Sequence, residues 1–445
     1  MYFKKETFLI LGLMKSGISC GTLLLKRGAK CYFYENNPFV KQKCSEQITS
    51  LGGIIIDDDR IDDVLNEITV LLLSPGFPID NAISKKARDR GVRITGELEL
   101  GCEYLNSTII AITGTNGKTT TTYLIDDMLK KFGIKSEAVG NVGTPVTSLV
   151  GKDSFEDVAV TEVSSFQLET CNRIIPHIAV ILNITPDHLE RHYTFENYVY
   201  MKSKLIQNMR ESEFAVLNYD DLNVREMKNK TRAKVVYFSL LQETNGAYLR
   251  DDKIFYKGEY ILDKNEILLK GEHNVSNVLA CVTVAKLMGV DTEIIKNSLK
   301  TFKGAKHRIE YVTNVNGIDF YNDSKSTNPD STIKAVETME KQTLLLLGGK
   351  DKNLDFKPMM EKLGDKVKGI YLYGEARYKL YEDARSCNIL NISLTNNMES
   401  AVKLAFSDAK SGQTVLLSPA CSSFDEFNGY EERGERFIGI VKCLH

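Results

Sequence analysis

The segment AITGTNGKTTT, residues 111–121, contains the residue types that bind phosphate groups. Glycines let the backbone approach an anion, and the backbone amides at a helix start attract negative charge. Lys118 adds an ammonium group that can reach nucleotide phosphates, and Thr119 adds a hydroxyl that can bind Mg²⁺. The longer pattern G-x-x-x-x-G-K-[ST] would place a glycine where this chain has Ile112. We therefore interpret the segment as a shortened nucleotide-binding loop.

Two further polar segments come directly after apolar runs. TEVSSFQLE (161–169) ends such a run with Glu162, which offers a second oxygen ligand, beside the Thr119 hydroxyl, for a metal ion. NITPDHLERH (183–192) places Asp187 and His188 just beyond another run. Taken alone, these residues are equally consistent with a solvent-facing carboxylate and a structural histidine. The nearby phosphate loop favours a functional interpretation.

Two hydroxyl-rich segments lie in the last third of the chain. YNDSKSTNPDST (321–332) and SPACSSFDEFNGYEERGERF (418–437) have few apolar residues, which is also typical of surface loops. Both directly follow strand-like runs. Ligands of open α/β sheets bind at the carboxyl ends of strands, so these segments are candidate binding loops.

Short continuous apolar runs predict the elements that position these residues. Such runs suit parallel strands that are covered on both faces, and helical segments such as 119–133 and 274–289 lie between them. The fold class is therefore α/β, doubly wound. The predicted strands are 8–13, 70–76, 108–114, 157–163, 177–185, 214–221, 343–349, 369–374 and 414–420.

A chain of 445 residues is too long for one typical core and predicts several domains. We expect a dinucleotide-type domain over 1–96, a central domain over 97–303 that holds the phosphate loop, and a third domain over 304–445. Residues 231–270 alternate strand-like and turn-forming stretches and predict a β-rich excursion of the central domain.

The composition limits the class of partner. With 42% hydrophobic residues, 26% charged residues and a net charge of −2, the chain lacks the basic excess of a nucleic-acid-binding protein. Nine cysteines without C-x-x-C pairs indicate reduced thiols in a cytoplasm. No apolar stretch approaches the roughly 18 residues of a membrane helix. The N-terminal apolar run ends at Lys15 without a signal-peptide cleavage pattern, which argues against secretion.

Taken together, seven segments resemble one family, the ATP-dependent Mur ligases. They occur in the family's order and span essentially the whole chain. The resemblance is strongest to the members that add D-glutamate, and the family's phosphate loop has the short form T-G-T-N-G-K-[ST], which accounts for Ile112. The segments are TGTNGKTTT, TEVSSFQLE, NITPDHLERH, GEHNVSNVLA, AKHRIE, YNDSKSTN and SPACSSFDEF.

The resemblance implies a monomeric, cytoplasmic enzyme of peptidoglycan synthesis with three α/β domains. These are a Rossmann-like UDP-binding domain, a central ATPase-type parallel sheet and a Rossmann-like domain that binds the amino acid. The enzyme would join D-glutamate to UDP-N-acetylmuramoyl-L-alanine through an acyl phosphate, with cleavage of ATP to ADP and phosphate. The implied cofactors are ATP, two Mg²⁺ ions and a CO₂-derived carbamate on a lysine. No nucleic acid or membrane is implied.

Residue roles carry over from the family's motifs. The implied catalytic residues are Lys118, Glu162, His188 and Lys202, of which Glu162, His188 and carbamylated Lys202 join Thr119 as metal ligands. Lys204 is the alternative carbamylated lysine, although the family places this lysine four residues after the tyrosine, here Tyr198. The implied ATP-binding residues are Gly114, Thr115, Asn116, Gly117, Lys118, Thr119, Thr120, Asn274, Asn277, Arg308 and Asp323.

The two other substrates have their own implied sets. Family members often carry aspartate at the position of Glu35, and Lys350 is an alternative to Lys352 in GGKDKN. The implied UDP-substrate residues are Met14, Lys15, Ser16, Glu35, Asn36, Ser74, Pro75, Gly76, Asn141, Ser164 and Gln167. The implied D-glutamate residues are Thr327, Lys352, Ser423, Phe424 and Tyr430.

Three other interpretations compete with this one. A dehydrogenase would leave the phosphate loop unexplained, and a regulatory ATP-binding module would need neither DHLERH nor the polar C-terminal loops. A sister ligase with another amino acid, or a folate-chain ligase, is the stronger rival. NDSKSTN and SPACSSFDEF favour glutamate addition. Sites on separate domains further predict domain closure, with Arg308 and Asp323 reaching the nucleotide only in a closed state.

Overall fold

The computed structural model describes residues 3, 6–269, 271–304, 306–351 and 354–444. The chain forms two compact units, Met1–Phe302 and Lys303–His445, which we describe separately. The finer domain boundaries expected after residues 96 and 303 stay predictions. The α/β class holds throughout, and each predicted apolar run contains a strand.

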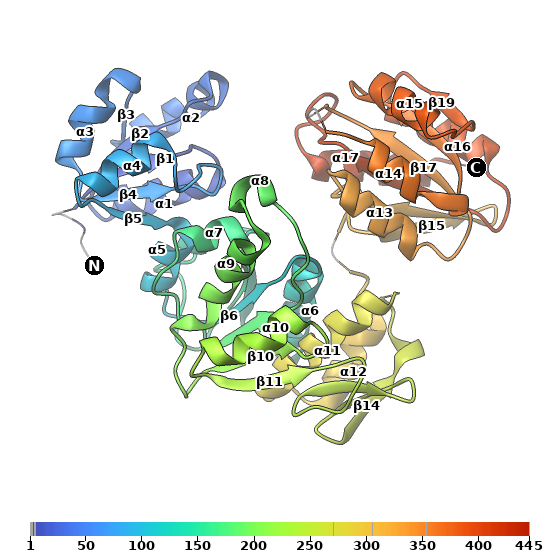
Figure 1. Ribbon diagram of the computed structural model, residues 1–445, viewed down its shortest axis with the longest axis horizontal. Helices are drawn as coiled ribbons and strands as arrows, with labels where there is room; N and C mark the ends of the chain where they lie inside the picture. The colour runs from blue at the N-terminus through green and yellow to red at the C-terminus, as the bar shows by residue number, and fades with distance from the viewer. Residues whose placement is uncertain (1–2, 4–5, 270, 305, 352–353, 445) are drawn as a thin grey trace. The chain divides into compact units, whose positions relative to one another are not determined.

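The first unit begins with a five-stranded parallel sheet of order β3-β2-β1-β4-β5 (Figure 1, blue). Alternate residues of its strands face two cores, one formed with α1 and α2 and the other with α3 and α4. The strands are β1 (Thr7–Leu11), β2 (Lys30–Tyr34), β3 (Ile54–Ile55), β4 (Val70–Leu73) and β5 (Arg93–Gly96). The helices are α1 (Lys15–Lys26), α2 (Pro38–Ser50), α3 (Ile61–Glu67) and α4 (Ala82–Asp89).

The strand order of this sheet reverses between β1 and β4, which creates a crevice at their carboxyl ends. Gly12 follows β1 with φ +94°, a conformation that disfavours other residues. A side chain at Gly17, in the first turn of α1, would collide with the Gly12 carbonyl. The Ser74 hydroxyl after β4 donates to that same carbonyl at 3.0 Å. This close approach shapes the crevice.

A six-stranded parallel sheet of order β11-β10-β9-β6-β8-β7 forms the centre of the first unit. Helices α6, α11 and α12 cover one face, and α5, α7, α9 and α10 cover the other. The strands are β6 (Thr108–Thr113), β7 (Ser136–Gly140), β8 (Val158–Glu162), β9 (Ile178–Ile181), β10 (Phe214–Asn218) and β11 (Lys234–Phe238). The helices are α5 (Glu97–Tyr104), α6 (Lys118–Phe132), α7 (Ser165–Glu169), α8 (Leu189–His192), α9 (Phe195–Gln207), α10 (Leu222–Arg225), α11 (Glu272–Leu287) and α12 (Thr292–Thr301).

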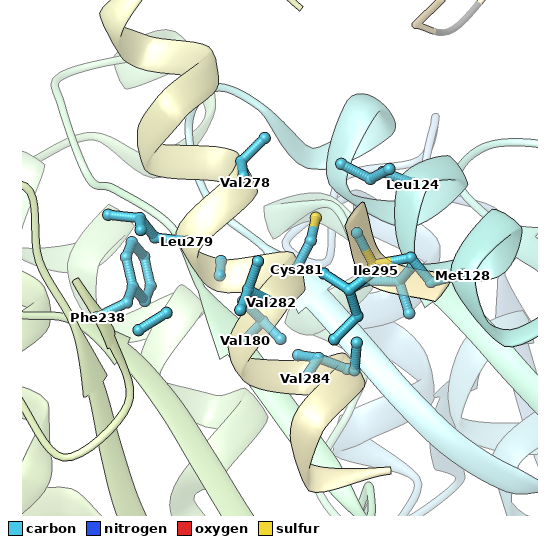
Figure 2. Close-up of a cluster of buried hydrophobic side chains, with 14 of the residues drawn as sticks. Leu124, Met128, Val180, Phe238, Val278, Leu279, Cys281, Val282, Val284 and Ile295 are labelled. Carbon is cyan, nitrogen blue, oxygen red and sulfur yellow. The ribbon is translucent and has the colours of Figure 1, made fainter. Parts of the chain in front are cut away.

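Helix α11 is the most deeply buried helix of this core. Its side chains pack against α6, α12, β9 and β11 in the cluster of Figure 2. Val278, Leu279, Ala280, Cys281 and Val282 are consecutive and all fully buried, so they cover every side of the helix. A helix that is apolar all round is typical of the interior of a large domain.

The β-rich excursion over 231–270 is confirmed in part. Strands β12 (Ala247–Arg250), β13 (Lys253–Tyr256) and β14 (Glu259–Asp263) form a separate three-stranded antiparallel sheet. The prediction is wrong for β11, which pairs in parallel with β10 and belongs to the main sheet. Because β11 is an edge strand, its residues alternate in burial, which is the pattern that led us to include it in the excursion.

The second unit has a six-stranded sheet of order β15-β16-β20-β17-β18-β19 (Figure 1, orange). Helices α13, α14 and α15 cover one face, and α16 and α17 cover the other. Strand β15 is antiparallel to β16, and the remaining pairs are parallel. The strands are β15 (Glu310–Val315), β16 (Ile318–Asn322), β17 (Thr343–Gly348), β18 (Val367–Tyr373), β19 (Ile392–Leu394) and β20 (Thr414–Ala420). The helices are α13 (Pro329–Thr338), α14 (Lys357–Lys362), α15 (Arg377–Ser386), α16 (Met398–Asp408) and α17 (Tyr430–Lys442).

All nine cysteines lie among the described residues and are free thiols. Five are buried, three are half-buried, and Cys443, just after α17, is exposed. Within the described ranges, no helix combines the length and the apolar character that crossing a bilayer requires.

Candidate active site

The phosphate loop connects β6 to α6, and Lys118 is the first residue of that helix. The Lys118 ammonium folds back over the loop and donates to the carbonyls of Gly114 and Thr115, both at 2.9 Å. Gly117 has φ +85°, and a side chain there would collide with the amide of Asn277 on α11. The loop therefore keeps its tight shape without a glycine at position 112, where Ile112 is a buried core residue of β6.

Asn183, in the loop after β9, fixes the conformation of the phosphate loop. Its carbonyl accepts from the Thr115 amide and its side-chain oxygen accepts from the Asn116 amide, both at 2.8 Å. Its side-chain nitrogen donates back to the Asn116 carbonyl at 3.1 Å. The sequence analysis did not single out Asn183, although it lies in the quoted segment NITPDHLERH.

Glu162 ends β8, and its side chain points into the protein beside the phosphate loop. The residue is 2% exposed, so the alternative of a solvent-facing carboxylate is wrong. Its two oxygens accept from the Thr119 hydroxyl and from the Asn141 side-chain amide, each at 2.7 Å. Asn141, expected to contact the UDP-sugar, is thus held against Glu162.

Lys202 and Lys204 lie on α9 and point to different sides of it, as residues two apart on a helix must. Lys202 is 1% exposed and donates to the Gly114 carbonyl at 2.8 Å. Burial, and then the charge of Lys118, holds the pKa of the Lys202 ammonium well below its usual range. Lys204 instead donates to the Glu169 carbonyl at 3.2 Å. The structure therefore brings Lys202, and not Lys204, to the phosphate loop.

His188 precedes the four-residue helix α8 and has a left-handed backbone with φ +52°. Its imidazole is 43% exposed, and the Asp187 carboxylate lies 3.6 Å from its Nε2 atom. The Phe166 ring packs against it with ring centroids 4.8 Å apart. His188 is thus a solvent-accessible side chain on a backbone that its surroundings must hold in place.

The predicted adenine-side residues Asn274 and Asn277 lie on one side of α11, three residues apart. Asn277 is buried against Gly117, and its side chain donates to the Asn274 side-chain oxygen at 3.3 Å. Thr120, the other predicted residue of this set, is buried in the first turn of α6. The structure therefore joins α11 directly to the phosphate loop.

The predicted UDP-substrate residues of the first sheet lie at its crevice. The Glu35 carboxylate accepts from the amides of Leu13 and Asn37 at 2.9 and 3.0 Å, which fixes the loop before α1. In that segment Met14 and Lys15 are exposed, Ser16 is half-buried, and Asn36 is exposed after β2.

A small pocket connects this crevice with α7. It is lined by Ser74 and Pro75 of the loop after β4 and by Gln167 of α7, all three of them predicted substrate residues. Gly76 follows in the same loop and is exposed. Ser164 and Gln167 form a capping box that satisfies the start of α7, so Gln167 is held by its own helix.

In the second unit, Arg308 and Asp323 are close to each other. Asp323 is fully buried, and its carboxylate accepts from the Ile309 amide at 3.2 Å and the Ser418 hydroxyl at 2.7 Å. Burial raises the pKa of Asp323 to about 6, although the Arg308 guanidinium acts in the opposite direction. Among the described residues, the buried Nε atom of Arg308 has no hydrogen-bond partner.

The predicted D-glutamate residues lie around the carboxyl ends of β16 and β20. Thr327 is half-buried, Ser423 is buried, and the neighbouring Phe424 is exposed. Tyr430 begins α17, and its carbonyl accepts from the Ser324 hydroxyl at 2.8 Å. Lys352 lies outside the described residues.

The alternative lysine, Lys350, follows β17. Its amide donates to the Ser422 carbonyl at 2.8 Å, which places its backbone beside the Ser423 loop.

Arg433, on α17, is fully buried beneath these loops and was not predicted. Its guanidinium donates to the Ser324 hydroxyl and carbonyl at 2.9 and 2.8 Å. It also donates to the carbonyls of Cys421, Ser422 and Gly348 at 3.1, 3.3 and 3.4 Å. One cation therefore connects the loops after β16, β17 and β20.

Comparisons with known proteins agree with this geometry. The Mur ligase middle domain model matches residues 112–285, and the model described as Mur ligase, glutamate ligase domain matches residues 307–421. The UDP-N-acetylmuramoylalanine–D-glutamate ligase of Thermoanaerobacter sp. (strain X514) is 42% identical over 454 residues, covering all of both chains. The chain belongs to the Mur ligase family, among its D-glutamate ligases.

Other curated relatives carry the same name, and solved structures share the fold. The enzyme of the same name from Koribacter versatilis is 40% identical, and the match covers all of this chain and 99% of that enzyme. The one from Clostridioides difficile (strain 630) is 38% identical, and the match covers all of both chains. The UDP-N-acetylmuramate–alanine ligase MurC from Thermotoga maritima matches 98% of this chain and 99% of its own with a TM-score of 0.61 at 16% identity. The structure of MurF from the same organism, in complex with ADP, covers 93% of this chain and 94% of its own. Its TM-score is 0.59, also at 16% identity.

These structural matches show the fold, and the curated relatives show the branch of the Mur ligase family. The predicted fold class and the predicted family are both confirmed. As a Mur ligase, the chain is an ATP-dependent ligase.

Proposed function

We propose that this Mur ligase joins D-glutamate to UDP-N-acetylmuramoyl-L-alanine in peptidoglycan synthesis, with cleavage of ATP to ADP and phosphate. The full-length identity with D-glutamate ligases supports the substrates. The observation that carries the chemistry is the cluster of Lys118, Thr119, Glu162 and Lys202 around one phosphate loop. The two lysines and the carboxylate are close enough to act on one set of phosphate groups.

The first step activates a carboxylate, which is otherwise a poor acylating agent. The alanine carboxylate attacks the γ-phosphorus, the bond from that phosphorus to ADP breaks, and an acyl phosphate forms. Charge accumulates on the phosphoryl oxygens, so the protein's task is to position the reactants and neutralise charge. Lys118, which now donates to two loop carbonyls, exchanges them for phosphate oxygens when ATP binds.

The second step forms the amide bond. The D-glutamate amine attacks the acyl carbon, phosphate leaves with the electrons of the carbon–oxygen bond, and the nitrogen loses a proton. We assign the binding of D-glutamate to Thr327, Ser423, Phe424 and Tyr430, together with Lys352 or Lys350. Thr327, Ser423 and Phe424 come from loops that Arg433 holds together through Ser324, Cys421 and Ser422.

The residues beside the phosphate loop fit a divalent cation. Thr119 and Glu162 present oxygen atoms 2.7 Å apart, and Mg²⁺ in nucleotide sites is bound by one or two carboxylates together with substrate phosphates. Within the described ranges, no group of three or more His, Cys, Asp and Glu side chains forms a complete metal site. Mg²⁺ bound there would neutralise phosphate charge, and His188 is the side chain we assign to a second ion.

We further propose that Lys202 carries a CO₂-derived carbamate. The reaction needs an unprotonated amine, and the lowered pKa of the buried Lys202 favours that form. Lys202 already lies among the loop carbonyls. Its carbamate would be an anionic oxygen ligand for a cation.

The substrates, the oligomeric state and the location follow from the same proposal. The chain's partners would be two small molecules, UDP-N-acetylmuramoyl-L-alanine and D-glutamate, besides ATP. We infer a monomer in the cytoplasm, because every group assigned above comes from this one chain and the nucleotide substrates are cytoplasmic metabolites.

The decisive experiment measures phosphate release from ATP with Mg²⁺ and UDP-N-acetylmuramoyl-L-alanine, with and without D-glutamate. Parallel reactions contain L-glutamate, L-alanine, a diamino acid or a dipeptide. We expect release that requires both the UDP-sugar and D-glutamate. Release with another amino acid would instead indicate a sister ligase. No release with any of them would indicate a nucleotide-binding module.

The carbamate has its own test. After equilibration with ¹³C-bicarbonate, the wild type should show a carbamate carbon resonance that is lost in Lys202→Arg and kept in Lys204→Arg. A resonance that survives in Lys202→Arg would assign the modification elsewhere.

A further inference from the structure

The segment that follows His188 is held in an unfavourable backbone conformation. Helix α8 has only four residues and lies between His188 at φ +52° and Tyr193 at φ +67°. Residues other than glycine rarely adopt these angles and do so where the surrounding structure requires it. Contacts outside the helix must therefore fix the position of His188.

Arg191 makes the strongest of these contacts. Its guanidinium donates to both carboxylate oxygens of Glu169, the last residue of α7, at 2.8 and 2.7 Å. The same guanidinium donates to the carbonyls of Phe77 and Pro75 at 3.0 and 3.3 Å and lies 4.9 Å from the centre of the Phe166 ring. The Arg191 and Glu169 side chains are only 15% and 5% exposed, so water competes little with these bonds.

The next two residues continue the same connection. His192 shares a hydrogen bond with the Ser165 hydroxyl at the start of α7, at 3.0 Å. The Tyr193 hydroxyl donates to the Asp80 carboxylate, in the segment between β4 and α4. Three consecutive side chains, Arg191 and His192 at the end of α8 and Tyr193 just after it, thus contact α7 and the segment after β4.

These contacts join two parts of the site that the proposed function uses differently. The loop after β4 contains Ser74, Pro75 and Gly76, which we assign to the UDP-sugar, and His188 is assigned to a second Mg²⁺ ion, which would bind near the reacting carboxylate. We propose that Arg191 is a positioning residue that couples the UDP-sugar loop to His188, so that the bound sugar presents its carboxylate to the phosphoryl group. This inference rests on the proposed function and adds to it a residue with no direct role in binding ATP.

A merely structural role for Arg191 predicts a different result. General loosening of the unit would weaken ATP and UDP-sugar binding together. A coupling role predicts a selective effect, because the Arg191 donors contact the sugar loop and α7, whereas Asn183, two residues of α9 (Tyr198 and Lys202) and α11 contact the phosphate loop.

The test compares Arg191→Ala with Arg225→Ala. Arg225 is a matched control, because it also lies on a four-residue helix, α10, and stacks over an aromatic ring, that of Tyr219, at 5.0 Å. We expect Arg191→Ala to raise the KM for UDP-N-acetylmuramoyl-L-alanine about tenfold and to lower kcat by about tenfold to a hundredfold. The KM for ATP should change by less than about twofold, and Arg225→Ala should resemble the wild type.

Two milder variants protect the test against loss of folding. Arg191→Lys keeps the charge but not the parallel pair of hydrogen bonds, so it should fall between the wild type and Arg191→Ala. Tyr193→Phe removes only the bond to Asp80 and should raise the same KM about threefold. Equal changes in the KM values for ATP and the UDP-sugar, or no change in a folded variant, would overturn the inference.

Calorimetry that measures the binding of UDP-N-acetylmuramoyl-L-alanine distinguishes a failure of this inference from a failure of the proposed function. A wild type that binds the UDP-sugar but releases no phosphate with D-glutamate would overturn the proposed function alone, and the Kd ratio of the variants would still test Arg191. A wild type that does not bind the UDP-sugar would overturn both.

Discussion

The phosphate loop and the loops of the second unit use cations in different ways. In the phosphate loop, Lys118 and Lys202 both donate to the carbonyl of Gly114, which belongs to that loop. In the second unit, Arg433 donates to atoms of four residues from three separate loops.

This difference indicates what each cation does. An ammonium that donates to carbonyls of its own loop, as that of Lys118 does, can exchange them for an incoming phosphate. A guanidinium whose three nitrogen atoms all donate to the protein cannot change partners without breaking the fold around it. We therefore expect the charge of Lys118 to bind the ligand and that of Arg433 to stabilise the loops. Recognition of D-glutamate is then expected to depend on the hydroxyls, aromatic rings and lysine assigned to it above.

The largest effect should come from Lys118→Ala. Removing the cation that we assign to the ATP phosphates should lower kcat by about a thousandfold, because preorganised charge is worth most where charge develops. The melting temperature should change little, since the Lys118 side chain donates to carbonyls of its own loop. Phosphate-release kinetics and thermal melts measure the two effects.

Lys130→Ala is the control for Lys118. Lys130 lies on the same helix and pairs with Asp126 on its surface. If Lys118→Ala lost stability and kept its kcat, the contrast between the two regions would be wrong.

Arg433→Ala should have the opposite effect to Lys118→Ala, with its main effect on stability. It leaves several buried carbonyls without a donor, so we expect the free energy of unfolding to fall by about 3 to 4 kcal/mol. Urea denaturation of the full chain measures this loss, with Arg436→Ala as the control, because Arg436 is exposed on the same helix and contacts Glu399. A variant of unchanged stability with a raised KM for D-glutamate would make Arg433 a ligand-binding cation instead.

Asp323 provides a pH test of the second unit. Burial raises the pKa of its carboxyl to about 6, so the folded state binds the proton more tightly than the unfolded state does. The stability contributed by protonated Asp323 is therefore present at low pH and is lost as pH rises from about 4 to about 6, by up to about 3 kcal/mol. In Asp323→Asn this part of the pH dependence of urea denaturation should disappear. If the two curves stayed parallel, Asp323 would not be the titrating group.

The smallest effect should come from Lys204→Met. This change removes one hydrogen bond, to the Glu169 carbonyl, and keeps most of the buried side-chain volume. Stability should fall by about 1 kcal/mol, and kcat should change by less than about threefold. Lys202→Met, two residues away, should be far less active in the same assay. Similar kinetics for the two variants would contradict the assignment of Lys202 to the phosphate loop.

Sequence alone predicted those parts of the candidate site where the proposed function requires a particular residue type at a particular position. The glycines and Lys118 must occupy fixed positions in the loop, and Glu162 must end a strand, so a local pattern shows them. Lys202 and Lys204 could not be separated in that way with certainty, because the choice depends on which side of α9 faces the phosphate loop.

Arg191, Asn183 and Arg433 escaped prediction for a physical reason. Most of their partners are backbone groups from segments far away in the chain. Every residue has a backbone carbonyl, so the amino-acid sequence does not show which carbonyls accept these hydrogen bonds. Only the folded chain shows which carbonyls converge on one guanidinium.

The fold was predicted best where strands are buried on both faces. Strands β17 and β20 read as continuous apolar runs and were found. Strand β15 is half-exposed and was not predicted, although Asn316 and Gly317, both with positive φ, form the kind of tight turn that joins it to β16. Edge strands carry a weaker signal because one of their faces need not be apolar.

The distribution of the thiols gives the molecule a practical property. Cys443 is exposed just beyond α17, and the other eight cysteines are buried or half-buried. A maleimide-linked spin label or fluorophore should therefore react first at Cys443, in the second unit, without prior removal of native cysteines. A second label, on one cysteine introduced into the first unit, would allow the distance between the two labels to be measured during turnover. A decrease in that distance would report the expected approach of Arg308 and Asp323 to bound nucleotide.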